Sequence, residues 1–218
     1  MKSSSTVAKV TDNSDGLKKT KLDQRFAFWY RVEDNLQPHK TTLEKNKYEE
    51  QVKKIAEFET IEDFWAIFQH LRKPDSCKPG IEFQLFKEPI KPMWEDEWNK
   101  NGGRVSIKLN KGFTTIIWEE MIFALIGNVL PKEMKEQING VVVSSRKDYN
   151  ILQIWFKTFD SKISLEIEHC IRDLLQIPSD VSLEIKQFFR PKREFIQHRN
   201  DNKFSKNKEN DGWGKRGE

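Results

Sequence analysis

The chain has 218 residues, of which 36% are hydrophobic and 33% charged, and its formal net charge is +4. This length is enough for one domain with a sizeable core. The small net charge contrasts with the strong positive charge of many non-specific nucleic-acid binders, so any contact with nucleic acid is expected to be local. The two cysteines, Cys77 and Cys170, lack metal-site spacing and favour a reducing compartment. No apolar run approaches the ~18 residues of a membrane span, and the N-terminus lacks the apolar segment of a signal peptide. The expected localisation is cytoplasmic.

The two ends of the chain differ in composition from its middle. Residues 1–22 are rich in Ser, Thr, Lys and Asp and lack hydrophobic periodicity, which predicts a disordered tail. Residues 191–218 are rich in Lys, Arg, Asn and Gly and predict a flexible basic tail. Between the tails, residues 23–190 are expected to form one folded domain.

Alternation of apolar and polar residues predicts the strands. The first strand contains Phe26, Phe28, Tyr30 and Val32, and the polar residues 33–50 after it predict a loop. Residues 141–146 and 151–157 flank the turn Lys147-Asp148-Tyr149-Asn150 and predict a hairpin. The later strands are expected at residues 81–85, 104–109, 141–146, 151–157 and 183–189.

Apolar residues at helical spacing predict three helices between these strands. Thr60 followed by Asp63 resembles a capping box at the start of the first helix. The three apolar arcs are Ile61, Phe64, Trp65, Phe68 and Leu71; Trp118, Met121, Ile122 and Leu125; and Ile163, Ile167, Cys170, Ile171 and Leu174. Hairpin-like strands with one-sided helices predict an α+β fold, in which helices cover one face of an antiparallel sheet and the other face is free for a ligand.

Several side chains are expected on that open face. Trp155 alternates with the core-facing Ile154 and therefore points away from the helices, where it either caps a cross-strand pair or forms the wall of a slot. Arg104 and Lys108 share the non-core face of their strand, and Arg146 ends another strand. Such basic residues either keep the face soluble or contact phosphates.

The outer surfaces of two predicted helices carry unexpected aromatic residues. Phe123 falls between Glu119 and Glu120 on the polar side of its helix, and Trp65 lies at the edge of its apolar arc, one turn after Ile61. Single exposed apolar residues are common. Two such helices side by side would also form a groove for an amphipathic partner helix.

The sequence contains no catalytic or metal-binding motif. The four histidines are scattered, and no nucleophile elbow, metalloprotease motif or P-loop occurs. Neither an enzyme nor a metal or cofactor is expected. A different chemistry is indicated by Trp94 beside Glu95, in a segment rich in turn residues. An aromatic face next to a carboxylate suits a planar, cationic heterocycle with N–H donors on its edge, such as a methylated guanine, although such a pair can also be a lid over the core.

An ordered series of segments over about residues 22–190 resembles the translation initiation factor 4E family, which binds the messenger RNA cap. These segments are Ile61-Glu62-Asp63-Phe64-Trp65, Leu85-Phe86-Lys87, Ile90-Lys91-Pro92-Met93-Trp94-Glu95-Asp96, Gly102-Gly103-Arg104, Leu125-Ile126-Gly127, Gly140-Val141-Val142-Val143 and Ile154-Trp155. The resemblance implies a curved antiparallel sheet backed on its convex face by three helices, with the cap slot on the concave face. It also implies a fold domain over residues 23–190 that binds the cap.

The resemblance also implies roles for individual residues. Tyr48 and Trp94 match the two aromatics that sandwich 7-methylguanine, and tyrosine in the first position is similar to the class II branch, the 4E-homologous cap-binding protein. Glu95 matches the acceptor of the guanine edge. Trp155 matches the residue beside the methyl group. The matches to phosphate contacts are Arg104 and Arg146.

The partner surface of the family corresponds to Ile61, Trp65, Glu119, Glu120 and Phe123. Its implied partners are proteins with a Tyr-x-x-x-x-Leu-φ helix, where φ is apolar, such as 4E-binding repressors or a 4G-type scaffold.

The chain departs from the family at three places. Ile151 stands where a further phosphate-contacting lysine is usual, Thr20-Lys21-Leu22 replaces the usual His-Pro-Leu entry, and Phe188-Phe189-Arg190 replaces a more polar segment near the phosphates. Arg190 or Lys192 are candidates to compensate for the missing lysine. The expected function is to bind capped mRNA as a monomer and to regulate translation, by repression or selective tuning. The alternative is a general initiation factor that recruits the 4G scaffold, and the rival from another class is a cap-processing enzyme.

Overall fold

The computed structural model of the protein describes residues 18–33 and 44–188. Most of the two predicted tails therefore lies outside the described residues, as do Arg190 and Lys192. The first strand begins at Lys21, so the last two residues assigned to the N-terminal tail, Lys21 and Leu22, belong to the folded domain. No helix in the described ranges is long and apolar enough to cross a membrane.

Seven strands form one antiparallel sheet in the order β2-β1-β3-β5-β6-β4-β7. All six predicted strands are present, and β2 is an additional one. The strands are β1 (Lys21–Val32), β2 (Lys53–Thr60), β3 (Ile81–Lys87), β4 (Gly103–Asn110), β5 (Ile138–Ser145), β6 (Tyr149–Phe156) and β7 (Leu183–Gln187). Strands β2 and β7 form the two edges of the sheet, and β3, β5 and β6 lie in its middle.

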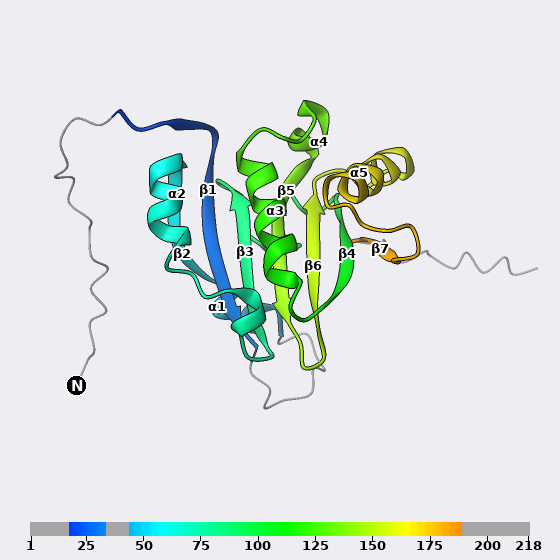
Figure 1. Ribbon diagram of the computed structural model, residues 1–218, viewed down its shortest axis with the longest axis horizontal. Coiled ribbons are helices and arrows are strands. Elements are labelled where there is room, and N and C mark those ends of the chain that lie inside the picture. The colour runs from blue at the N-terminus through cyan, green and yellow to red at the C-terminus, as the bar shows by residue number, and fades with distance from the viewer. Residues whose placement is uncertain (1–17, 34–43, 189–218) are drawn as a thin grey trace, which may run out of the picture.

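Three helices cover one face of the sheet, as predicted (Figure 1). They are α2 (Ile61–Phe68), α3 (Thr114–Ile126) and α5 (Ser161–Leu174). Thr60 accepts a hydrogen bond from the Asp63 backbone N–H and so caps α2, in agreement with the predicted capping box. A short helix, α4 (Lys132–Gln137), precedes β5.

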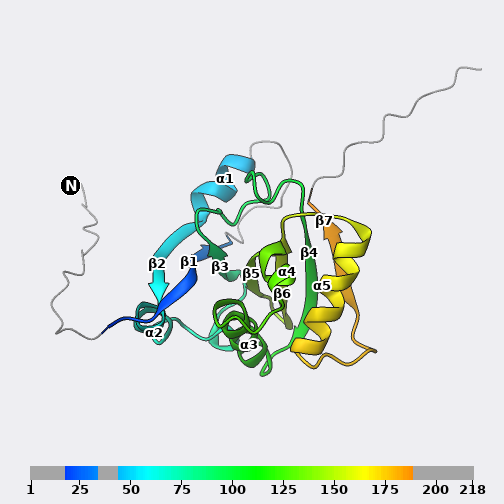
Figure 2. The same cartoon turned by 90° about the horizontal axis from the view of Figure 1, so that it is seen from above.

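The prediction of a loop over residues 33–50 is wrong for its last part. Residues 44–51 form a helix, α1 (Glu44–Gln51), which lies on the side of the sheet opposite α2, α3 and α5 (Figure 2). The polar sequence of α1 has almost no amphipathic pattern, so periodicity could not reveal it. It is held through Tyr48 and the buried Val52 at its end, rather than by an apolar stripe.

The main core lies between the convex face of the sheet and the three helices. Alternate residues of β3, β5, β6 and β4 point into it, including Leu85, Val141, Ile154 and Ile107, each fully buried. Trp118, Met121 and Leu125 of α3 meet them from the helix layer. A second, smaller cluster on the concave face consists of Phe86, Ile90, Val142 and Trp155, with Trp94 and Phe188 packed against it.

Gly140 of β5 lies between Phe86 and Trp155 in the strand register of the concave face. A Cβ atom at this position would lie 2.4 Å from Cγ of Phe86 and 2.6 Å from the Leu85 carbonyl oxygen. The backbone oxygen cannot move away cheaply, so glycine is required for this close approach of strand and ring.

We predict that Gly140→Ala lowers the free energy of unfolding by about 1–3 kcal/mol through overpacking, measured by chemical denaturation. The control is Ser106→Ala on the same face. The Ser106 hydroxyl lacks a hydrogen-bond partner among the described residues, so its loss should cost less than about 1 kcal/mol. Equal stability of Gly140→Ala and the wild type would contradict this account of the glycine.

Candidate functional site

The strand register divides the concave face into rows of side chains that run across the sheet. We call the first the polar row, which consists of Arg31, Glu82, Ser144, Ile151 and Lys108. The second, the aromatic row, consists of Ala27, Phe86, Gly140, Trp155 and Arg104. Because alternate residues of a strand face opposite sides, the same alternation that fills the core also builds these rows.

Trp155 is held firmly in the aromatic row. Its indole packs edge-to-face on Phe86, with ring centroids 5.4 Å apart and an interplanar angle of 88°, and its Nε1 donates to Oε1 of Gln153 at 3.1 Å. Phe188, just after β7, approaches the indole to 4.4 Å between centroids. Trp94 packs against the same cluster. The structure therefore brings together Trp94 and Trp155, which the sequence assigned to one slot.

The loop that carries Trp94 and Glu95 is anchored by one fully buried amide. Nδ2 of Asn99 donates to the carbonyl oxygens of Lys91 and Met93 at 2.9 and 2.8 Å. Nδ2 of Asn139, at the start of β5, donates to Oδ1 of Asn99 at 2.9 Å. These bonds pin both ends of the Trp94-Glu95 turn to the sheet, and sequence reasoning missed both asparagines because their partners are backbone atoms and distant residues.

Tyr48 reaches this site from α1. Its hydroxyl donates to the Pro92 carbonyl oxygen at 3.5 Å, and the guanidinium carbon of Arg31 lies 4.8 Å from its ring centroid. Burial and then the Glu82 charge raise the pKa of Tyr48 to about 12, and the Glu95 charge contributes in the same direction. The phenol is therefore neutral at physiological pH, and Glu95 is close enough to act on it.

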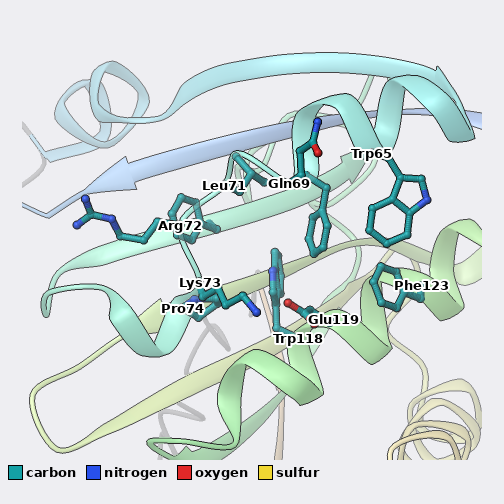
Figure 3. Close-up of a pocket in the computed structure, with 11 residues that line it drawn as sticks. Trp65, Gln69, Leu71, Arg72, Lys73, Pro74, Trp118, Glu119 and Phe123 are labelled. Atoms are coloured by element: carbon teal, nitrogen blue, oxygen red, sulfur yellow. The ribbon is translucent and has the colours of Figure 1, made fainter.

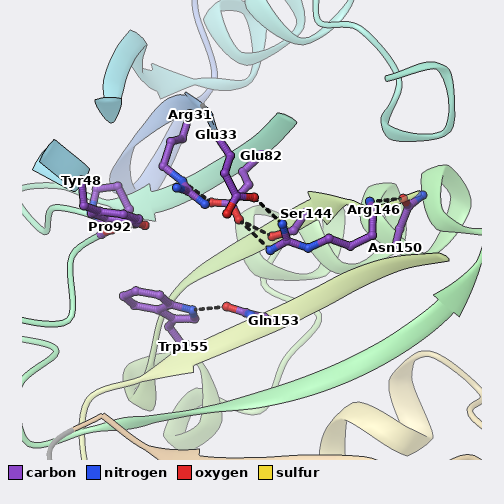
Figure 4. A network of polar contacts seen from close by, with 10 residues as sticks. All are labelled: Arg31, Glu33, Tyr48, Glu82, Pro92, Ser144, Arg146, Asn150, Gln153 and Trp155. Atoms are coloured by element: carbon purple, nitrogen blue, oxygen red, sulfur yellow. Dashed lines mark hydrogen bonds and ion pairs between the residues drawn. The ribbon is translucent and has the colours of Figure 1, made fainter. Parts of the chain in front are cut away.

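The two predicted phosphate contacts, Arg104 and Arg146, have different surroundings. Arg104 is the register neighbour of Trp155, and its buried Nε has no hydrogen-bond partner among the described residues. Arg146 is instead engaged by carboxylates: its Nη1 lies 2.5 Å from Oε2 of Glu33 and its Nη2 lies 3.4 Å from Oε1 of Glu82 (Figure 4). A phosphate would have to share Arg146 with these two acids.

The neighbours of Ile151 supply no replacement for the missing lysine. In the polar row Ile151 lies between Ser144 and Lys108. Nζ of Lys108 lies over the Tyr149 ring, 4.1 Å from its centroid, so the ammonium makes a cation–π contact there. Lys108 is therefore the cation of the polar row beside Ile151, and it already contacts an aromatic ring.

A pocket of about 350 Å³ opens on the convex side between α2 and α3. Trp65, Glu119 and Phe123 line it, together with Phe68 and Trp118. Trp65 on α2 faces Phe123 and Glu119 on α3 across it (Figure 3). Trp65 is 48% exposed, and its ring lies 5.6 Å from that of Phe123. The pocket thus unites three of the five predicted partner residues.

The other two predicted partner residues, Ile61 and Glu120, are exposed on the same helices but do not line the pocket. Trp118 was predicted as core, and it is 2% exposed, yet it also forms part of the pocket wall. Because Trp118 belongs to the apolar stripe of α3, the sequence indicated its role in the core and not its contact with the pocket. Within the described ranges, no group of three or more His, Cys, Asp or Glu residues could hold a metal ion.

Comparison with known proteins identifies the fold. The family model described as Eukaryotic initiation factor 4E matches residues 21–211. Eukaryotic translation initiation factor NCBP of Oryza sativa is 31% identical over 181 residues, which cover 82% of this chain and 76% of that protein. Eukaryotic translation initiation factor 4E1 of Drosophila melanogaster is 37% identical over 141 residues, 63% of this chain and 54% of the relative.

Solved structures agree in fold. A complex of Caenorhabditis elegans eIF4E-3 with the 4E-binding protein Mextli and a cap analog superposes with a TM-score of 0.69 at 28% identity, over 78% of this chain and 93% of that one. Ascaris suum eIF4E-3 with an m7G cap gives the same score and identity over 80% and 94%. The family consists of cap-binding factors and not of enzymes, which confirms the prediction of a non-catalytic protein. With its helix-backed curved sheet and a match over most of its length, the chain belongs to the eukaryotic initiation factor 4E family.

Proposed function

We propose that this protein binds the 7-methylguanosine cap of mRNA in a slot between Tyr48 and Trp94 on the concave face, and that it regulates translation in the cytoplasm as a monomer. The observation that carries the proposal is the convergence of Tyr48, Trp94, Glu95 and Trp155 from three separate parts of the chain, namely α1, the loop after β3, and β6. Family membership supports a role in translation initiation at the cap.

The chemistry of the slot suits a cationic base. Methylation at N7 makes guanine cationic, and a cation is attracted to aromatic faces. The carboxylate of Glu95 can accept the N1–H and N2–H₂ donors of the guanine edge as charge-assisted hydrogen bonds. Unmethylated guanine offers the same edge without the charge, so the methyl group should be recognised through stacking, with Trp155 beside it.

The phosphate end supports weak rather than tight binding. Arg104 is available next to Trp155, Arg146 is shared with Glu33 and Glu82, and Ile151 carries no charge. Tyr48 also offers a smaller aromatic face than tryptophan. We therefore infer that the protein competes poorly for bulk messages alone and needs a partner or an RNA-bound protein to add avidity.

The pocket between α2 and α3 supports recruitment of such a partner. Its apolar wall of Trp65, Phe68 and Phe123 suits the apolar residues of a Tyr-x-x-x-x-Leu-φ helix. A related structure holds the 4E-binding protein Mextli. Weak cap affinity with a separate partner surface favours repression or selective tuning of translation. The alternative role is a general initiation factor that recruits a 4G-type scaffold. Competition between a peptide from a 4E-binding repressor and a peptide from a 4G-type scaffold would separate these roles.

Fluorescence titration with 7-methyl-GTP and GTP tests the proposed function. Stacking should quench tryptophan fluorescence, and the methylated nucleotide should bind at least about tenfold more tightly, because the charge of the base adds to each stacking contact. Equal affinity for both nucleotides would refute cap binding.

We predict that Glu95→Gln weakens 7-methyl-GTP binding by about 2 kcal/mol or more, because the amide places a donor against the guanine donors and removes the complementary charge. Glu97→Gln in the same loop is the control, since Glu97 is exposed and pairs only loosely with Lys100 at 3.5 Å. A matching loss in Glu97→Gln, or none in Glu95→Gln, would place guanine recognition elsewhere.

We predict that Ile151→Lys tightens 7-methyl-GTP binding by roughly three- to tenfold at low salt, and that the gain fades as salt screens the new ammonium–phosphate attraction. Ile151→Met, which adds no charge, should leave the affinity unchanged. Titration of both variants at two salt concentrations measures the effect. A gain that is insensitive to salt would contradict the electrostatic explanation.

We predict that Trp65→Ala abolishes binding of Tyr-x-x-x-x-Leu-φ peptides and leaves 7-methyl-GTP binding intact, because the two sites lie on opposite faces of the sheet. Leu165→Ala on α5, where the side chain is 63% exposed, should affect neither. Calorimetry with peptide and nucleotide measures both. Loss of nucleotide binding in Trp65→Ala would mean that Trp65 supports the core instead.

A further inference from the structure

Arg31 is a charged residue in an unusual place. It lies on β1 in the polar row, is only 7% exposed, and its guanidinium carbon approaches the Tyr48 ring centroid to 4.8 Å. Its Nε donates to Oε2 of Glu82 at 2.8 Å. A buried arginine that both pairs with an acid and faces an aromatic ring is fixed in two directions, since the guanidinium is planar and rigid.

Glu82 holds this arginine in place from the neighbouring strand. Its Oε1 accepts from Oγ of Ser144 at 2.7 Å and lies 3.4 Å from Nη2 of Arg146, while its Oε2 is left for Arg31 (Figure 4). Each carboxylate oxygen therefore has its own partner. Burial acts to lower the pKa of Arg31, but the hydrogen bond and charge of Glu82 outweigh it and the pKa is raised.

Within the described residues, the other polar contacts of Tyr48 involve its hydroxyl, through Gln84 and Pro92. The helix that carries it is polar, and the neighbouring Glu49 and Glu50 are exposed. The hydroxyl bond to Pro92 is long at 3.5 Å, and the ion pair of Glu49 with Lys91 is 3.6 Å long with both side chains 58% exposed. Exposed pairs of this kind contribute little. From the sheet, the Arg31 guanidinium therefore lies over the Tyr48 ring itself, whereas Gln84 of β3 interacts with the Tyr48 hydroxyl.

We propose that Arg31 is a positioning residue of the base slot, which acts through Tyr48: Glu82 fixes the guanidinium, and the guanidinium fixes the orientation of the Tyr48 ring on which a cationic base stacks. This inference rests on the proposed function and names a residue that does not itself touch the ligand. The Glu82 carboxylate has a second effect here. It neutralises Arg31, so that a cation beneath the ring does not repel the cationic base.

A double-mutant cycle tests the proposal. Dissociation constants for 7-methyl-GTP are measured for the wild type, Arg31→Met, Tyr48→Ala and the double variant, with thermal unfolding of each. Arg31→Met should weaken binding by about 3- to 30-fold, the range of a cation–π contact that is partly to fully desolvated. In the Tyr48→Ala background, the same change should alter the affinity by less than about twofold, because no ring remains to be positioned.

An equal loss in both backgrounds would overturn the proposal, as would no loss beside an intact Tyr48. Arg31→Met also leaves Glu82 without one partner, so Arg31→Met/Glu82→Gln, which removes both charges, provides a second variant in case the first unfolds. It should show the same loss and the same dependence on Tyr48, and a different pattern would count against the proposal.

Nuclear magnetic resonance of ring-labelled tyrosine in the ligand-free protein separates this inference from the proposed function. The Tyr48 ring signals should shift and change width in Arg31→Met and should stay unchanged in Arg25→Met, whose side chain is exposed on the same strand. If the wild type fails to bind 7-methyl-GTP, the proposed function falls. The Tyr48 signals still decide whether Arg31 positions the ring, and unchanged signals in Arg31→Met would overturn that role.

Discussion

The alternation of side chains in a seven-stranded antiparallel sheet is the constraint on which the rest of the structure depends. One face must bury its apolar residues beneath α2, α3 and α5, so every second residue of the same strands is committed to the opposite face. Ile154 and Phe156 of β6 therefore belong to the main core beneath the helices, and Trp155 between them belongs to the smaller cluster on the concave face. The aromatic row and the polar row follow directly from the packing of the core.

Among the described residues, the concave face buries charged side chains, which the main core beneath the helices does not. Arg31 and Glu82 are both almost fully buried, and burying single charges is costly unless each is paired and hydrogen-bonded. The cluster of Arg31, Arg146, Glu82 and Glu33 balances two cations with two anions. This balance stabilises the face without a ligand, and it also explains why Arg146 is not simply free for phosphate.

Sequence alone predicted the fold and the membership of the family because both depend on local patterns and ordered motifs. The strands around Phe28, Ile107 and Ile154 were found by their period of two, and the comparisons and the sheet confirm the α+β architecture. Strand β2 was missed because it is a charged edge strand, with Lys53, Lys54 and Glu57 on it. Helix α1 was missed because it has no apolar face.

The arrangement of the candidate site was less accessible from sequence. Arg146 was matched to phosphate contacts, but its nearest partner is Glu33, 113 residues earlier in the chain. The sequence did not indicate that Arg31 is buried, because a basic residue in a strand usually lies on a solvated face. Its burial depends on the pairing with Glu82 on the neighbouring strand. The aromatic residues Trp94 and Trp155 could be predicted because motif and alternation both point to them.

The central claim is that the base slot and the partner surface lie on opposite faces of one sheet. The most direct measurement is the nuclear magnetic resonance spectrum of the indole N–H groups of the seven tryptophans during titration with 7-methyl-GTP. The account predicts large shifts for Trp94 and Trp155 and none for Trp65, which lies on the convex side. Shifts at Trp65 with Trp94 and Trp155 unchanged would contradict it.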